Sequence, residues 1–301
     1  MASIFNFQFG SFSESSPSWF DWLSLFVSTA SIFLAYYIAK WIYSKEKRDK
    51  KKENETLVKS TFQLFKNNLN QLNAAIKAQK ISLEEYHKEK NFKLTFHPDV
   101  QVDFLQFIDV KSLYEKVGFG NEEAISNIND LMSNLYRLYD FRQSLRSEVR
   151  AYLEKYGFFE LRFYSYRQVL YSKYFKLCNR RGKDFIIENN TKKWRFEDTD
   201  IFMREYSTLR ANILLDKEIM DESGLKDRGL LNERFLVPLI NEITFKYIPE
   251  DIDAIEINDV ANEAHNAFND MEYITEKHFS TIESYIQNLE GISTKIETYL
   301  A

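Results

Sequence analysis

A long run of apolar residues near the start of the chain is followed at once by a cluster of basic residues. Between Asp21 and Lys40, 18 consecutive residues carry no charge. The apolar residues that follow Lys40 extend the run to the length needed to cross a bilayer. Trp and Tyr side chains stand at both ends, where the headgroup layers would lie. The pattern predicts one transmembrane helix over residues 19–43, because a buried helix of a soluble domain needs neither the aromatic ends nor the basic flank.

Charges on the two sides of this predicted span indicate its orientation. Residues 1–21 contain Glu14 and Asp21 but no Lys or Arg, whereas 7 basic residues lie from Lys40 to Lys52. Because basic loops stay on the cytoplasmic side, we expect the N-terminus outside and the C-terminus in the cytoplasm. A cleaved signal peptide would have a basic start and a small-residue cleavage site, and neither is present. We therefore expect an uncleaved anchor behind an outer tail, residues 1–18, that is disordered.

Small side chains within the span recur at steps of four, three, four and four. They fall on one narrow strip of a helix, formed by Ser24, Ser28, Ser31, Ala35 and Ala39. In lipid, strips of small residues let helices approach closely, so this strip is expected to pack against copies of the span. Its three hydroxyls could instead line a pore. The expected partners here are membrane lipid and a second copy of the chain.

The segment that follows, residues 44–90, joins the basic cluster to a heptad-like helix. Its apolar seam alternates steps of four and three, through Val58, Phe62, Phe65, Leu69, Leu72 and Ile76. Such a seam is typical of a coiled coil. Two interpretations are open: a parallel stalk that joins the subunits of a homo-oligomer, or an amphipathic helix packed on its own domain.

Residues 91–301 predict a helical cytosolic domain, so the fold class is mainly α. Only 12 residues of the chain are Gly or Pro, and a single Cys excludes a disulfide framework. The segment DFIIENNTKKWRFE predicts a short hairpin in which Phe185 and Ile187 face Trp194 and Phe196 across a polar loop. Helices are expected over 99–117, 122–156, 158–179, 199–221, 229–247 with a kink at Pro238, and 268–299. The last is heptad-like and could pair with the 58–83 helix within or between subunits.

The overall charge of −5 conceals two halves of opposite sign. From Arg137 to Arg195 there are 15 basic and 6 acidic residues, whereas Phe196 to Ala301 has 9 basic and 23 acidic. Basic groups among aromatic rings can bind phosphate and stack on bases. This predicts a site for an anionic ligand such as a nucleotide signal, nucleic acid or inner-leaflet lipid, built from Arg137, Arg142, Arg146, Arg150, Arg162, Arg167, Lys173, Lys176, Arg180 and Arg181. The alternative is a solvated face that answers the acidic C-terminal half.

Catalytic chemistry leaves no recognisable pattern in this sequence. Phosphate-binding glycine loops, zinc-binding His pairs, nucleophile elbows and paired CxxC motifs are all missing. We therefore assign no catalytic residue, metal or cofactor. One of the four scattered histidines, His278, occupies an apolar seam position, where protonation would make packing sensitive to pH.

The layout as a whole resembles the single-span membrane effectors of bacterial abortive-infection and anti-phage systems. The resemblance rests on the outer tail, the span, the polybasic flank and a cytosolic body rich in Phe, Tyr, Asn and Lys over residues 19–301. It implies location in the bacterial inner membrane, a cytosolic module that perceives an infection signal, and a span bundle that acts as an ion channel or otherwise compromises the membrane. A partner protein encoded nearby could supply the signal.

Two other functions stay open at this point. A non-conducting membrane scaffold would recruit a protein, nucleotide or nucleic acid through the basic, aromatic-rich surface. A hydrolase with an unfamiliar site is the third possibility, because acidic residues abound in the C-terminal half.

Overall fold

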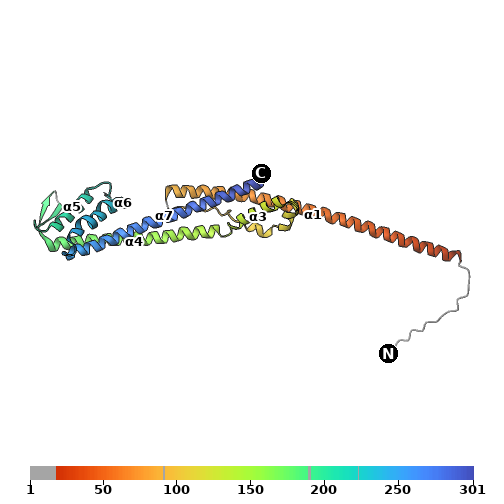
Figure 1. Ribbon diagram of the computed structural model, residues 1–301, viewed down its shortest axis with the longest axis horizontal. Coiled ribbons are helices and arrows are strands. Elements are labelled where there is room, and N and C mark those ends of the chain that lie inside the picture. Colours follow the sequence, from red (N-terminus) through yellow and green to blue (C-terminus); the bar gives the residue numbers. More distant parts are fainter. Residues whose placement is uncertain (1–17, 91, 189–190, 223) are drawn as a thin grey trace, which may run out of the picture. The chain divides into compact units, whose positions relative to one another are not determined.

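The computed structural model describes residues 18–90, 92–188, 191–222 and 224–301 (Figure 1). It is mainly α-helical, with two short antiparallel strand pairs, and so confirms the predicted fold class. The predicted outer tail lies outside the described residues, except for Ser18.

Helix α1 is a single helix from Trp19 to Glu89, 71 residues long. It contains no Gly or Pro, so nothing in its sequence interrupts the backbone hydrogen bonds between the predicted span and the heptad-like segment. Its N-terminal part is long and apolar enough to cross a membrane, and none of its apolar 18-residue window is buried. The helix ends where Lys90 adopts a positive φ of 47° and donates its N–H to the carbonyl of Tyr86.

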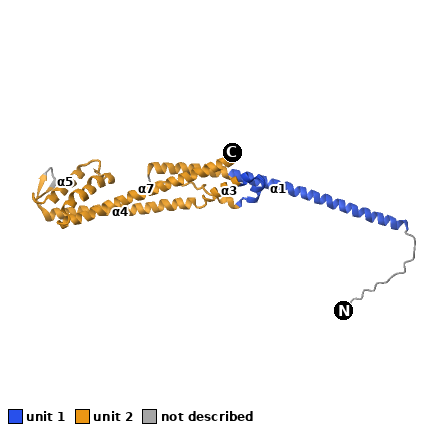
Figure 2. Ribbon diagram, viewed as in Figure 1, with its two compact units in different colours: residues 1–67, 107–125 blue, residues 68–106, 126–301 orange. Residues whose placement is uncertain are grey.

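The chain forms two compact units (Figure 2). The first comprises residues 1–67 and 107–125 and contains the short helix α2, Val110–Val117. Asp109 caps α2 by accepting the N–H groups of Lys111 and Ser112, and Asn54 of α1 donates to Glu115 at 3.3 Å. These contacts place α2 against the part of α1 that follows the basic cluster.

The second unit, residues 68–106 and 126–301, is built on two long helices. Helix α4, Phe141–Arg181, runs antiparallel to α7, Ile252–Leu300 (Figure 1). Successive ion pairs show the direction, because Arg162 meets Glu263 whereas Lys173, further along α4, meets the earlier Glu256. The long C-terminal helix is therefore confirmed, and it begins 16 residues before the predicted start at residue 268.

Two predicted helix boundaries near α4 were wrong. The predicted helix over 122–156 is divided into α3, Glu122–Tyr136, and the start of α4, with a turn over residues 137–140. The turn is anchored by the buried side chains of Leu138 and Phe141. The expected break near Gly157 does not occur, because one Gly costs a helix only about 1 kcal/mol and packing along α7 outweighs it.

Smaller elements gather where α4 ends and α7 begins. The predicted hairpin is confirmed as β1, Gly182–Glu188, and β2, Thr191–Phe196, with Phe185 opposite Trp194. The predicted contact of Ile187 was wrong: Ile187 lies opposite Lys192, because antiparallel strands run in opposite directions from the Phe185 and Trp194 pair. Phe196 lies opposite Gly182, next to a bulge between Gly182 and Asp184. Helix α5, Ile201–Leu215, and a second strand pair, β3 (Met220–Asp221) and β4 (Gly224–Leu225), follow the hairpin.

The helix expected over 229–247 is irregular. It consists of α6 (Arg228–Leu231), two π-helical segments η2 (Asn232–Leu236) and η3 (Leu239–Ile243), and a 3-10 turn η4 (Thr244–Tyr247). Pro238 lies between the π segments, where its missing N–H removes one α-helical hydrogen bond. The structure thus shows a change of hydrogen-bonding pattern at Pro238, and the kink predicted there stays a prediction. A further 3-10 turn, η1, spans Asp103–Phe107.

The seam of α1 is filled from within the same chain. Leu69, Leu72 and Ile76 of the second unit are buried, and the neighbouring polar residues bond to α7. Ser293 donates to Asn73 at 2.7 Å, and Lys77 lies 2.6 Å from Glu297. At these three positions the single chain favours the second interpretation, an amphipathic helix packed on its own domain, and the oligomer seam stays a prediction.

The other seam positions lie in the first unit. Val58 and Phe65 are buried there, and Phe62 is half-buried. Asn73 and Lys77 of α1 contact Ser293 and Glu297 of α7. In the single chain, the two heptad-like helices therefore pair with each other. Assembly of several copies stays a prediction.

Candidate ligand site between α4, α5 and the π segment

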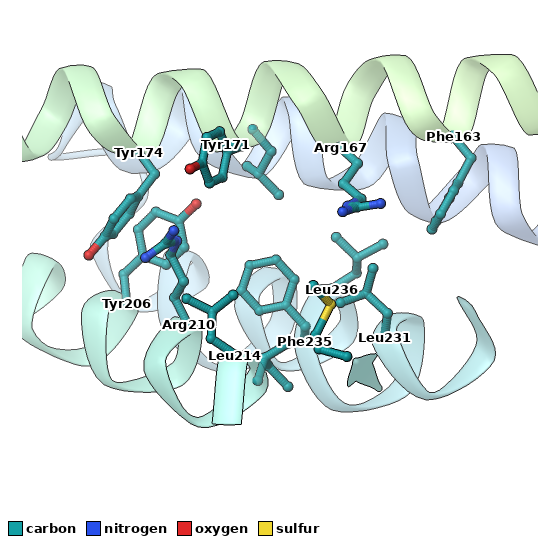
Figure 3. A pocket seen from close by; sticks show the side chains of 13 residues that line it. Phe163, Arg167, Tyr171, Tyr174, Tyr206, Arg210, Leu214, Leu231, Phe235 and Leu236 are labelled. Carbon is teal, nitrogen blue, oxygen red and sulfur yellow. The ribbon is translucent and has the colours of Figure 1, made fainter. Parts of the chain in front are cut away.

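A cavity of about 130 Å³ lies between α4, α5 and η2 (Figure 3). Most of its wall is apolar, and the polar exceptions are two Arg guanidinium groups and three Tyr hydroxyls. The apolar lining comes from Phe163, Leu170, Ile213, Leu214, Met220, Leu231, Phe235 and Leu236. A concave, mostly apolar space with a few polar groups is the usual form of a small-molecule site.

Helical periodicity places the two Arg side chains in this wall. On α4, Phe163, Arg167 and Leu170 follow steps of four and three, so all three point to one face. On α5, Tyr206, Arg210 and Ile213 repeat the same spacing. Each helix thus inserts one cation into an otherwise apolar stripe, and the two stripes face each other across the cavity.

Aromatic rings hold the Arg210 guanidinium in place. Its central carbon lies 4.4 Å from the ring centroid of Tyr174, 5.4 Å from that of Tyr171 and 5.2 Å from that of Phe175. Such contacts attract a cation to the ring face but leave its N–H groups without an acceptor. Arg167 is similarly placed, 5.8 Å from the ring of Tyr164.

Neither guanidinium is neutralised by the part of the chain that the structure describes. There, neither Arg167 nor Arg210 has a carboxylate within 4.0 Å or a hydrogen-bond acceptor, and no Asp or Glu lines the cavity. The other ionisable groups add no negative charge. Burial raises the pKa of Tyr206, Tyr174 and Cys178, so these groups stay neutral at physiological pH. The lining therefore carries two positive charges.

Four of the ten predicted anion-binding residues lie outside the cavity and are paired with acids. Arg162 lies 2.9 Å from Glu263 and Lys173 lies 2.7 Å from Glu256, both on α7. Arg180 pairs with Asp253, and Arg181 reaches Asp200 at 2.7 Å and Asp251 at 2.8 Å. For these four residues the geometry favours the alternative interpretation, in which basic side chains form ion pairs with the acidic C-terminal half.

The rest of the predicted set is spread along α4 and before it. Arg142 donates to the carbonyl of Pro98 at 3.1 Å, and Arg146 covers the ring of Phe96 at 5.4 Å. Lys176 lines a separate groove with Lys173 and Arg180. Arg150 is exposed on α4, and Arg137 is exposed in the turn before this helix. The ten residues do not converge on one site, and only Arg167 of the set lines the cavity.

Sequence reasoning missed Arg210. It lies in the acidic half of the chain, outside the segment searched for basic clusters. The signal that could have found it is the pair Tyr206 and Arg210, four residues apart on an otherwise apolar helix face.

The predicted positions in the span are exposed in this single chain. All five members of the small-residue strip are exposed, and the Ser31 hydroxyl donates to the carbonyl of Val27 at 2.7 Å. Packing and pore lining both stay predictions. Among the described residues, no group of three or more His, Cys, Asp or Glu side chains is arranged to hold a metal ion.

Comparison with known protein families, with characterised proteins and with solved structures found no match. The site is therefore interpreted from its geometry alone.

Proposed function

We propose that the chain is a membrane-anchored, homo-oligomeric helical effector of the anti-phage kind. In this proposal the C-terminal body lies in the bacterial cytoplasm and senses a signal, and a bundle of spans permeabilises the inner membrane. The observation that carries the proposal is α1: one helix without Gly or Pro contains both the apolar stretch and the segment that packs on α7.

The contacts of α7 support a link between sensing and the span. Near its start, α7 joins the elements around the cavity, where Asp251 and Asp253 contact Arg181 at the end of α4. Near its end, Ser293 and Glu297 bond to α1. A ligand that favours one position of α7 would therefore also favour one arrangement of the α1 segment that contacts it.

The small-residue strip supports assembly of the span. Replacing Ser24, Ser28 and Ser31 together by Leu adds bulk where helices would approach closely. We expect the triple variant to lose dye leakage from liposomes and to show a smaller mass in detergent. Thr29, Ala30 and Phe33 lie on the opposite side of the helix, so their replacement by Leu is the matched control. Unchanged leakage and mass in the Ser variant would contradict the proposal.

A membrane scaffold is the second candidate, favoured by an exposed apolar stripe on α4. Leu161, Tyr164, Tyr171 and Phe175 follow steps of three, seven and four, and Leu161 keeps 68% of its surface exposed. Exposed apolar patches bordered by polar residues often mark partner surfaces. Replacing residues 20–43 by a polyleucine span separates the two candidates, because a scaffold would still recruit its protein or nucleotide partner whereas a channel would stop conducting.

A further inference from the structure

We infer that the cavity between α4, α5 and η2 binds a small organic anion whose apolar body is about the size of a phenyl ring. The inference rests on the proposed sensing function and names the chemical class of the signal. It assigns Arg167 and Arg210 to the anionic group, and Leu231, Phe235 and Leu236 to the apolar body.

The charge of the lining favours an anion. Several other cations on α4 and η2 are neutralised by acids of the same unit: Arg162 by Glu263, Lys173 by Glu256, and Arg234 by Asp216 and Glu218. Arg167 and Arg210 line an apolar cavity with no such partner among the described residues. A carboxylate or phosphate would accept their free N–H groups in charge-assisted hydrogen bonds, which are the strong ones.

The size and walls of the cavity limit the rest of the ligand. An apolar cavity of about 150 Å³ in another protein accommodates benzene, and the present cavity is about 130 Å³. Aromatic side chains line it, and Figure 3 shows Arg210 beside Tyr206 and Tyr174, with Arg167 nearer Phe163. A planar ring can lie among these side chains while its charged substituent reaches a guanidinium. Inorganic phosphate alone would leave the apolar part of the wall without a partner.

The test measures binding of benzoate and phenyl phosphate to the full-length protein in detergent, by ligand-observed NMR and calorimetry. Benzyl alcohol is the neutral probe and inorganic phosphate is the probe without a ring. We expect both aromatic anions to bind, and both comparison probes to bind at least about tenfold more weakly. Equal binding of benzyl alcohol, or no binding of either aromatic anion, would overturn the inference.

Variants locate the site. The double variant Arg167→Gln and Arg210→Gln should weaken binding of the aromatic anions by about tenfold or more. Arg150→Gln removes an exposed charge from the same helix and should leave binding unchanged. A second variant, Leu214→Trp, fills the cavity from a partly exposed position and should also abolish binding. Unchanged binding in both cavity variants, each with native circular dichroism, would show that the probes bind elsewhere.

Failure of this inference can be distinguished from failure of the proposed function. The Ser24, Ser28 and Ser31 variant should bind the probes like the unmodified protein, because its changes lie in the span. If leakage depends on the small-residue strip but neither aromatic anion binds, the proposed effector function stands and the inferred ligand class is wrong. If the aromatic anions bind but leakage does not depend on the strip, the ligand site stands and the proposed effector function is wrong.

Discussion

The hydroxyl of Tyr86 lies 2.9 Å from Nε2 of His278 and joins the last turn of α1 to the middle of α7. The other ring nitrogen of His278, Nδ1, lies 3.0 Å from the Glu148 carboxylate on α4. Because that carboxylate accepts, Nδ1 carries the proton and Nε2 accepts from Tyr86. The imidazole also stacks on Tyr152, with ring centroids 4.1 Å apart and planes at 2°. Three helices are thus joined around one buried, neutral imidazole.

Stability should fall in mild acid because of His278. Burial lowers the pKa of His278 below its ordinary value of 6.5, although Glu148 opposes the shift. The unfolded chain therefore takes up this proton first, so the free energy of unfolding decreases as the pH falls below about 6.5. We expect thermal unfolding of the full-length protein to lose more stability between about pH 7.5 and about pH 5.5 than the His278→Phe variant loses. Parallel pH profiles for the two proteins would contradict this.

Removing only the Tyr86 hydroxyl should destabilise the junction of α1 and α7. Tyr86 is buried, so Tyr86→Phe leaves Nε2 of His278 without its donor at a cost of about 1–3 kcal/mol. Denaturant unfolding checks the loss. Tyr139→Phe is the control, because Tyr139 is exposed and its change should shift the free energy of unfolding by less than about 0.5 kcal/mol. A result in which both variants match the unmodified protein would refute the role of the hydroxyl.

Among the cations of the second unit, Arg181 should cause the largest loss of folding stability when it is replaced. Its guanidinium bonds both oxygens of Asp200, at 2.7 and 2.8 Å, and also bonds Asp251; these two carboxylates cap α5 and α7. Arg181→Met would leave partly buried carboxylates unpaired. We expect the free energy of unfolding to fall by about 2–4 kcal/mol. This is less than for a fully buried ion pair, because 22% of the Arg181 side chain is exposed.

Arg204→Met is the matched comparison for Arg181. Its partner Asp198 is 99% exposed, so the pair should contribute less than about 1 kcal/mol. Comparable losses for both variants in the same unfolding assay would show that burial of the Arg181 cluster contributes nothing.

Substitution by Ala should have opposite effects on stability at Gly157, inside α4, and at Gly182, just after its end. Gly157 lies in the helix interior with open space where a Cβ would stand, so Gly157→Ala should raise the free energy of unfolding by about 0.5–1 kcal/mol. At Gly182 a Cβ would overlap the Cys178 carbonyl and come within 2.6 Å of the Trp194 ring. Gly182→Ala should therefore destabilise the hairpin, and thermal melts of the two variants should shift in opposite directions.

Patterns that depend on near neighbours in the chain were readable from the sequence. The absence of Gly and Pro over α1, the apolar run within it, the 3-4 repeat of α7 and the alternation in the hairpin each reflect local backbone geometry. Arg167 also belonged to the predicted anion-binding set, although its nine companions were not brought to the cavity.

The tertiary structure alone decided which faces meet. The 3-4 repeat of the α1 seam could pack equally well on a second copy or on the antiparallel α7. Contacts such as those of Asn73 with Ser293 and Lys77 with Glu297 show the pairing with α7. In the same way, the sequence does not distinguish Arg162, which pairs with Glu263 of α7, from Arg167, which lines the cavity. Periodicity places a side chain on one face of its own helix, whereas burial and charge compensation depend on residues distant in the sequence that only folding brings near.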